Sequence, residues 1–173
     1  MAVPPRLAAA VDLVDPAPDA RVLEVGCGRG VAAALLADRL PRGHYTGIDR
    51  SAAAAAATLA RAPAGTVVTT ALAAFRPSPG AFDLALAVNV NLFWTGPAHA
   101  ELAVLATALR PGGVLHLVYG SDGGAAPRTD VVDRLRDHLV AGGFAPEVTM
   151  PTRRGVRLLH VRATSTTSGD QVR

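Results

Sequence analysis

Three glycines follow a short apolar run in the stretch RVLEVGCGRG, at positions 26, 28 and 30. Glycines do not stabilise the end of a strand, because each costs backbone entropy and offers no side chain for packing. They do allow a tight turn and the close approach of a ligand to the main chain, while the following helix presents free amide groups to an anion. The spacing predicts a strand, a glycine turn against a ligand, and a helix. A tight turn without a ligand is the alternative.

Segments typical of strands and helices alternate along the chain. The expected strands are residues 21–25, 44–49, 65–71, 81–90, 112–120, 144–150 and 155–163, and the expected helices are residues 31–40, 52–61, 97–110 and 129–143. This alternation is typical of βαβ units, which build a parallel sheet covered by helices on both faces. Only residues 151–154 separate the last two strands, too few for a parallel crossover, so these strands should form an antiparallel hairpin.

Length and composition favour one α/β domain. The 173 residues fit a single core, which alanine, leucine and valine must fill because only 4% of the residues are aromatic. We expect the domain to cover residues 1–163 and residues 164–173 to be a disordered tail. No apolar run is long enough for a membrane span, and the first residues do not resemble a signal peptide, so we expect a cytoplasmic protein without membrane contact.

The charged residues and the single cysteine exclude several classes of protein. Cys27 is the only cysteine, so an intrachain disulfide is impossible. All 17 basic residues are arginines, and they are scattered rather than gathered into the patch that a nucleic-acid binder needs. The chain has no lysine, which excludes the phosphate loop that ends in Gly-Lys. We therefore expect no nucleic-acid partner.

Asp49 ends the second expected strand, 19 residues beyond Gly30. In an open α/β sheet an acid at this position can accept hydrogen bonds from ribose hydroxyls. Together with the glycines, it indicates an adenosine-type cofactor. The third glycine comes one residue too early for the G-x-G-x-x-G pattern of dinucleotide-binding proteins.

Four segments resemble motifs of the class I S-adenosylmethionine-dependent methyltransferases: VLEVGCGRG, YTGID, FDLALAVN and LRPGGVLHLV. The resemblance covers most of the chain. It implies a Rossmann-like, doubly wound sheet of seven mostly parallel strands in the order 3-2-1-4-5-7-6, and S-adenosylmethionine as the cofactor.

The resemblance also implies which residues meet the cofactor. Gly26, Cys27, Gly28 and Gly30 would line its methionine part, with Glu24 near the amino group and Asn89 at the border. Asp49 would hold the ribose hydroxyls and Arg50 would lie beside the adenine. Many members place an acid on the loop after the third strand, near the adenine amine; this chain has Thr70, Ala71 and Leu72 there instead.

The substrate side is expected in residues 89–97, the segment after the fourth strand. Its candidate substrate-binding residues are Asn91, Phe93 and Trp94, although Trp94 could instead shield the sheet edge or the cofactor. This segment lacks the Pro-Pro-aromatic sequence of enzymes that methylate nucleic-acid bases or amides. Residues 1–15 and 119–128 would complete the pocket.

His99 and Tyr119 are the candidate general bases. His116 is expected in the core, His138 on a helix and His44 in a turn. No metal site is evident.

These features predict an enzyme that transfers a methyl group to a small molecule by in-line displacement, as a monomer or homodimer. The alternatives are a nicotinamide-dependent oxidoreductase and a protein that binds the cofactor without transferring the methyl group.

Overall fold

The computed structural model describes residues 3–120 and 129–166. The strands of the main sheet are β1 (Arg21–Val25), β2 (His44–Asp49), β3 (Thr66–Thr69), β4 (Phe82–Val88), β5 (Leu109–Tyr119), β6 (Phe144–Thr149) and β9 (Leu159–Ser165). The helices are α1 (Pro5–Val14), α2 (Val31–Ala37), α3 (Ala52–Arg61), η1 (Leu72–Ala74), α4 (Leu92–Thr95), α5 (His99–Ala108) and α6 (Thr129–Ala141). Across these ranges no helix has the length and hydrophobicity needed to cross a bilayer.

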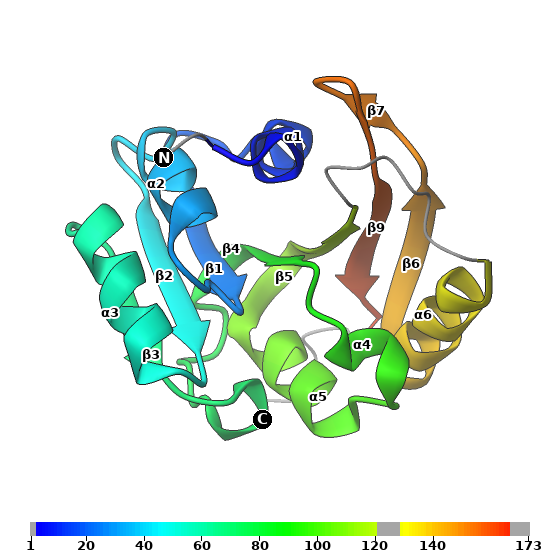
Figure 1. Cartoon of the computed structure of the whole chain (residues 1–173). Coiled ribbons are helices and arrows are strands. Elements are labelled where there is room, and N and C mark those ends of the chain that lie inside the picture. The colour runs from blue at the N-terminus through cyan, green and yellow to red at the C-terminus, as the bar shows by residue number, and fades with distance from the viewer. Residues whose placement is uncertain (1–2, 121–128, 167–173) are drawn as a thin grey trace.

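The seven strands form one sheet in the order β3-β2-β1-β4-β5-β9-β6 (Figure 1). The first five strands are parallel, whereas β9 pairs antiparallel with both β5 and β6. Because β9 is the seventh strand of this sheet along the chain and β6 the sixth, the predicted order and the antiparallel end are confirmed. The carboxyl ends of β1, β2 and β4 therefore meet at one edge.

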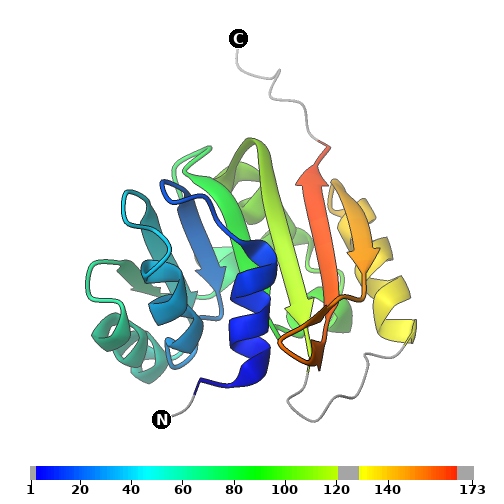
Figure 2. The ribbon, with the colours of Figure 1, turned by 90° about the horizontal axis from the view of Figure 1, so that it is seen from above.

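Helices cover both faces of the sheet and enclose two hydrophobic cores. Helix α1 lies across one face, together with α2 and α3 (Figure 2). On the other face η1, α4, α5 and α6 bury Leu72, Phe93, Leu105 and Leu135 against alternate residues of the strands. Strands buried on both faces are rich in apolar residues, which explains why β1 and β4 could be recognised in the sequence.

Helix α5 is shorter than the helix predicted over residues 97–110. It ends at Ala108, because Leu109 already pairs with Phe82 at the start of β5. Nε of Arg110 donates a hydrogen bond of 2.6 Å to Asp83 beside an irregularity in the β4–β5 register. Pairing with β4 thus outweighs the helix propensity of leucine and arginine.

The predicted C-terminal hairpin exists with different boundaries. Strand β9 begins at Leu159 rather than residue 155, because residues 152–157 form a small antiparallel ribbon of β7 (Thr152–Arg153) and β8 (Val156–Arg157). At the other end Thr164 and Ser165 belong to β9 and pair with β6, so the disordered tail expected from residue 164 was wrong at its start. The rest of that expected tail, residues 167–173, lies outside the described residues.

Candidate functional site

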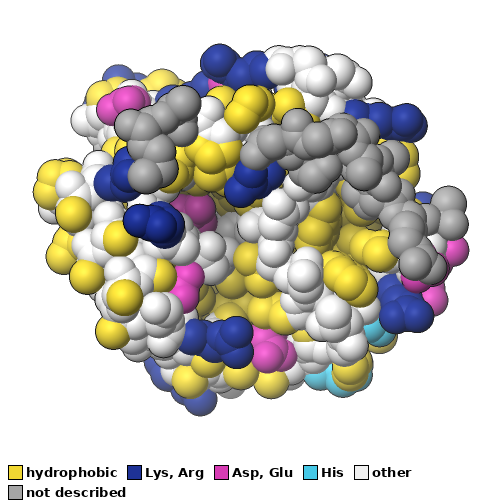
Figure 3. Space-filling view, viewed as in Figure 1, with side chains coloured by type: hydrophobic (Ala, Val, Ile, Leu, Met, Phe, Trp, Pro, Cys, Tyr) yellow, Lys and Arg dark blue, Asp and Glu magenta, His cyan; other side chains and the backbone are white. Residues whose placement is uncertain are grey.

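A cavity of about 570 Å³ opens at the carboxyl edge of the parallel strands. Figure 3 shows the face of the molecule on which it lies, with hydrophobic side chains within the hollow and acidic and basic ones around it. Its walls are formed by Val25, Gly26, Ile48, Asp49, Arg50, Thr70, Ala71, Leu72, Asn89, Val90, Asn91, Leu92, Thr95 and Glu101. This volume is in the range of cavities that hold a cofactor or a small ligand.

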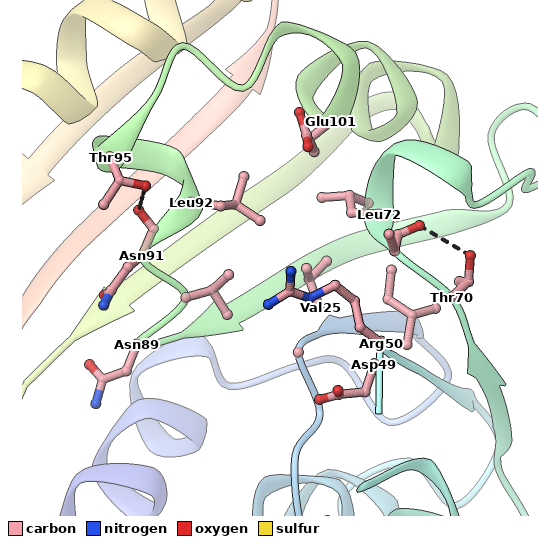
Figure 4. Close-up of a pocket in the computed structure, with 14 residues that line it drawn as sticks. Val25, Asp49, Arg50, Thr70, Leu72, Asn89, Asn91, Leu92, Thr95 and Glu101 are labelled. Atoms are coloured by element: carbon pink, nitrogen blue, oxygen red, sulfur yellow. Dashed lines mark hydrogen bonds between the residues drawn. The ribbon is translucent and has the colours of Figure 1, made fainter. Parts of the chain in front are cut away.

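Two main-chain amides position the carboxylate of Asp49 at the tip of β2. The N–H of Gly28 donates to Oδ2 and the N–H of Ser51 donates to Oδ1, each at 2.9 Å. Charge-assisted bonds of this kind fix the orientation of a carboxylate. Because Asp49 also lines the cavity, its remaining lone pairs can accept hydrogen bonds from a ligand diol (Figure 4).

Gly26 and Asn89 form the wall where β1 and β4 end. Gly26 has φ +71°, and a Cβ there would lie 2.9 Å from Cγ2 of Val90, so the main chain itself faces the cavity. Asn89 also has positive φ, at +55°. Its side-chain amide donates to the carbonyl of Gly120 and accepts from the N–H of Gly120. The side chain of Asn89 therefore joins the ends of β4 and β5. Asn89 also forms part of the cavity wall.

Gly30 lies outside the cavity wall and brings the glycine turn against α3. Its φ is +74°, and a Cβ at this position would lie 2.5 Å from the Cα of Thr58. Thr58 is fully buried and its hydroxyl donates to the carbonyl of Gly28 at 3.0 Å. The turn is thus held between the sheet and α3 by packing that requires the absence of a side chain.

Replacing Gly30 by alanine should destabilise the fold more than replacing Gly28 does. Both residues have positive φ, which costs a non-glycine residue about 1–2 kcal/mol. Only at Gly30 does the new methyl group meet main-chain atoms, whereas nothing lies nearer than 3.9 Å at Gly28. Chemical denaturation should give a free energy of unfolding about 1–3 kcal/mol lower for Gly30→Ala than for Gly28→Ala. Equal losses would contradict the close packing on Thr58.

Glu24 lies beneath the glycine turn rather than in the cavity wall. It is buried, and its Oε2 accepts a hydrogen bond of 2.6 Å from the hydroxyl of Tyr45. Burial raises the pKa of Glu24 to about 8; the Tyr45 hydrogen bond opposes this increase, and the nearby charge of Asp49 makes a smaller contribution to it. Burial likewise raises the pKa of Tyr45. The Glu24 carboxyl is therefore poised to change protonation near neutral pH. Cys27 is buried in the same turn.

Four of the residues predicted for substrate and catalysis do not line the cavity. Phe93 is 1% exposed in the core, because the short helix α4 turns it away from Leu92 and Thr95. Trp94 is half-buried against the same core, and His99 is exposed at the start of α5. The buried hydroxyl of Tyr119 donates to the carbonyl of Val90 at 2.8 Å, and burial raises the pKa of Tyr119. Tyr119 therefore supports the wall rather than facing the cavity.

The other expected positions divide between the cavity and the core. Arg50, Thr70, Ala71, Leu72 and Asn91 line the cavity. The part of the expected pocket at residues 121–128 lies outside the described residues, and α1, in residues 5–14, packs in the core on α2.

His116 lies in the sheet, as the sequence predicts. Its ring stacks on His160 of β9, with ring centroids 5.2 Å apart, and a hydrogen bond of 2.9 Å joins the two rings. Burial, with smaller effects from His160 and Arg162, lowers the pKa of His116 to about 3; burial also lowers the pKa of His160. Both rings are thus neutral in the folded protein at neutral pH.

Sequence reasoning did not single out two polar residues of the wall: Thr95, which lies within the expected substrate segment, and Glu101, which lies outside it. Thr95 donates its hydroxyl to the carbonyl of Asn91 at 3.0 Å, and Glu101 lies in the first turn of α5 (Figure 4). Glu101 is the only acidic residue between Asp83 and Asp122, which was the available signal. Within the ranges that the structure describes, no group of three or more His, Cys, Asp or Glu residues could hold a metal ion.

A family model described as "Methyltransferase domain" matches residues 22–113, a span that runs from within β1 into β5 and includes the glycine turn. Among curated proteins, a trans-aconitate 2-methyltransferase of Variovorax paradoxus is 33% identical over 162 residues, covering 84% of this chain and 62% of the relative. The chain spans less than two thirds of the length of the curated relatives it matches first.

Solved structures share the fold at low identity. A TehB-like S-adenosylmethionine-dependent methyltransferase of Corynebacterium glutamicum superposes with a TM-score of 0.67 at 20% identity, covering 92% of this chain and 86% of that chain. The [4+2]-cyclase SpnF superposes with a TM-score of 0.71 at 16% identity, covering 94% and 81%. One fold thus carries proteins named for different reactions, and the site must decide between them.

Proposed function

Because the chain belongs to the methyltransferase-domain family, we propose that it binds S-adenosylmethionine and transfers the methyl group to a small molecule. The single observation that carries this proposal is the meeting of the Gly26 main chain with the Asp49 carboxylate at one cavity. The cavity fits the cofactor chemically, because a fixed carboxylate suits a ribose diol and a bare main chain admits close contact.

The residues of the wall would act by positioning. When bound, the cofactor supplies a methyl carbon activated by a neighbouring sulfonium, so the protein mainly has to align an acceptor with that carbon. Asp49 would fix the nucleoside end, and Gly26 with the end of β4 would fix the methionine end. Asn91, Leu92 and Thr95 then form the wall beyond β4 and offer one amide and one hydroxyl to an acceptor. Neither His99 nor Tyr119 lines the cavity, so we assign the reaction no general base.

The acceptor class follows from the relatives and is part of the proposal. The Variovorax relative is named for methylating trans-aconitate, a small carboxylic acid. We therefore propose a small-molecule acceptor and trans-aconitate as the first compound to test. We also expect the protein to act in the cytoplasm, as a monomer or homodimer, without nucleic acid or membrane.

The proposal is tested first by binding and then by turnover. S-adenosylhomocysteine should raise the melting temperature, because a ligand at 100 times its Kd stabilises the native state by about 2.7 kcal/mol. NAD should leave it unchanged; the reverse result would indicate the oxidoreductase. Incubation with methyl-labelled cofactor and trans-aconitate or other small carboxylic acids should then label the acceptor. Cofactor binding without label in any acceptor, including those in a cell extract, would indicate a binding protein without transfer activity.

A further inference from the structure

Two opposite charges line the cavity without pairing. Arg50 follows Asp49 at the end of β2, and Glu101 belongs to α5. In the part of the chain that the structure describes, the Arg50 guanidinium and the Glu101 carboxylate have no hydrogen-bond or ion-pair partner. Arg50 is exposed and Glu101 is half-buried, so neither charged group is enclosed by the protein. Both groups are therefore available to a ligand.

Asp49 and Glu101 lie on opposite sides of the cavity. In Figure 4 the Arg50 guanidinium and the Leu72 side chain lie between these two carboxylates. Glu101 reaches this position because α5 packs on η1, the turn that contains Leu72. Glu101 lies in the first turn of α5, where the positive end of the helix dipole attracts a negatively charged group. The carboxylate of Glu101, a hydrogen-bond acceptor, thus lies across the cavity from Asp49.

The loop after β3 offers no charged side-chain acceptor in this region. The neutral hydroxyl of Thr70 is oriented by its donation to the carbonyl of Ala71 at 3.1 Å, and Ala71 and Leu72 have apolar side chains. A ligand edge that carries hydrogen-bond donors and extends from Asp49 past Leu72 would meet the carboxylate of Glu101.

This inference rests on the proposed function. We infer that Glu101 recognises the adenine base of the cofactor by accepting a hydrogen bond from its 6-amino group. The amino group is a donor and a carboxylate is only an acceptor, so the two are complementary. A 6-oxo purine would place an acceptor against the carboxylate and be rejected. Arg50 would lie along the face of the base, where a planar guanidinium stacks well. Glu101 is thus a specificity residue for the base, supplied by α5.

The test compares S-adenosylhomocysteine with S-inosylhomocysteine, which carries a 6-oxo group in place of the amine. Calorimetry should show that the wild-type protein prefers the adenosyl ligand by about 10- to 100-fold, because a hydrogen bond to a charged group has about that effect. Glu101→Ala should lose most of this preference, chiefly through weaker binding of the adenosyl ligand. Glu101→Gln, whose amide can both donate and accept, should bind both ligands with similar affinity.

Glu147→Ala is the matched control, since Glu147 is an exposed carboxylate on β6. It should keep the wild-type preference. If Glu101→Ala keeps that preference while Asp49→Ala loses binding, the assignment of Glu101 is overturned and the proposed function stands. If the wild-type protein binds neither ligand, both the inference and the proposed function fail. Circular dichroism and the melting temperature of each variant show whether a loss of affinity comes from unfolding.

Discussion

Asp49→Ala is expected to weaken the binding of S-adenosylhomocysteine by about 100- to 10,000-fold. A hydrogen bond to a charged group contributes about 1.5–3 kcal/mol, and Asp49 would accept two from the ribose hydroxyls. The substitution also leaves the N–H of Gly28 without its acceptor, because in the wild-type protein this N–H donates a hydrogen bond of 2.9 Å to the Asp49 carboxylate. Calorimetric titration gives the change in Kd directly. The fold should persist, because the β1–β2 ladder does not use this side chain.

Asp19→Ala is the appropriate control for this measurement. Asp19 is an exposed acid that precedes β1, and it therefore lies at the opposite edge of the sheet from the cavity. Its removal changes the net charge as Asp49→Ala does, but should leave the Kd unchanged. The Kd of Asp49→Asn should lie between those of Asp49→Ala and Asp19→Ala, because asparagine keeps one acceptor oxygen and loses the charge. An Asp49→Ala protein that is folded and binds with wild-type affinity would mean that the ligand lies elsewhere.

The features that the sequence predicted correctly depend on neighbouring residues. Strand β1 is a largely apolar run that ends at Gly26, β4 is a largely apolar run that follows Gly80, and Asp49 ends the run that follows Gly43. The glycine turn needs positive φ at the alternate positions 26, 28 and 30, and the sequence has a glycine at each of them. Parallel strands then bring these ends to one edge, so the cavity could be placed without coordinates.

The features that the sequence missed depend on helix phase and on contacts between distant segments. His99 and Glu101 are two residues apart on α5, so they cannot share a face, and it is Glu101 that points to the cavity. For the same reason Phe93 lies on a different face of α4 from Leu92 and Thr95, so Phe93 is in the core and the other two line the cavity. The choice of face depends on how α5 packs against η1, which no local pattern in the sequence records.

The buried carboxyl of Glu24 should make the stability of the ligand-free protein fall as pH rises. Its pKa is about 8 in the folded protein against 4.5 for an ordinary glutamate. Between these values the folded state holds a proton that the unfolded state releases, so the free energy of unfolding decreases by up to about 1.4 kcal/mol per pH unit. The contribution is complete below pH 4.5 and is lost as pH rises through about 8. Over the window it amounts to several kcal/mol.

Glu24→Gln isolates this effect, because glutamine keeps an acceptor for the Tyr45 hydroxyl and does not titrate. His116 and His160 act in the opposite direction below pH 6.5, since their neutral folded forms must compete with protonation in the unfolded chain. They are unchanged in the variant, so they cancel when the two proteins are compared. Urea denaturation from pH 5 to 8.5 should therefore show Glu24→Gln gaining stability relative to wild type as pH rises. Parallel curves would mean that Glu24 is already ionised in the folded protein.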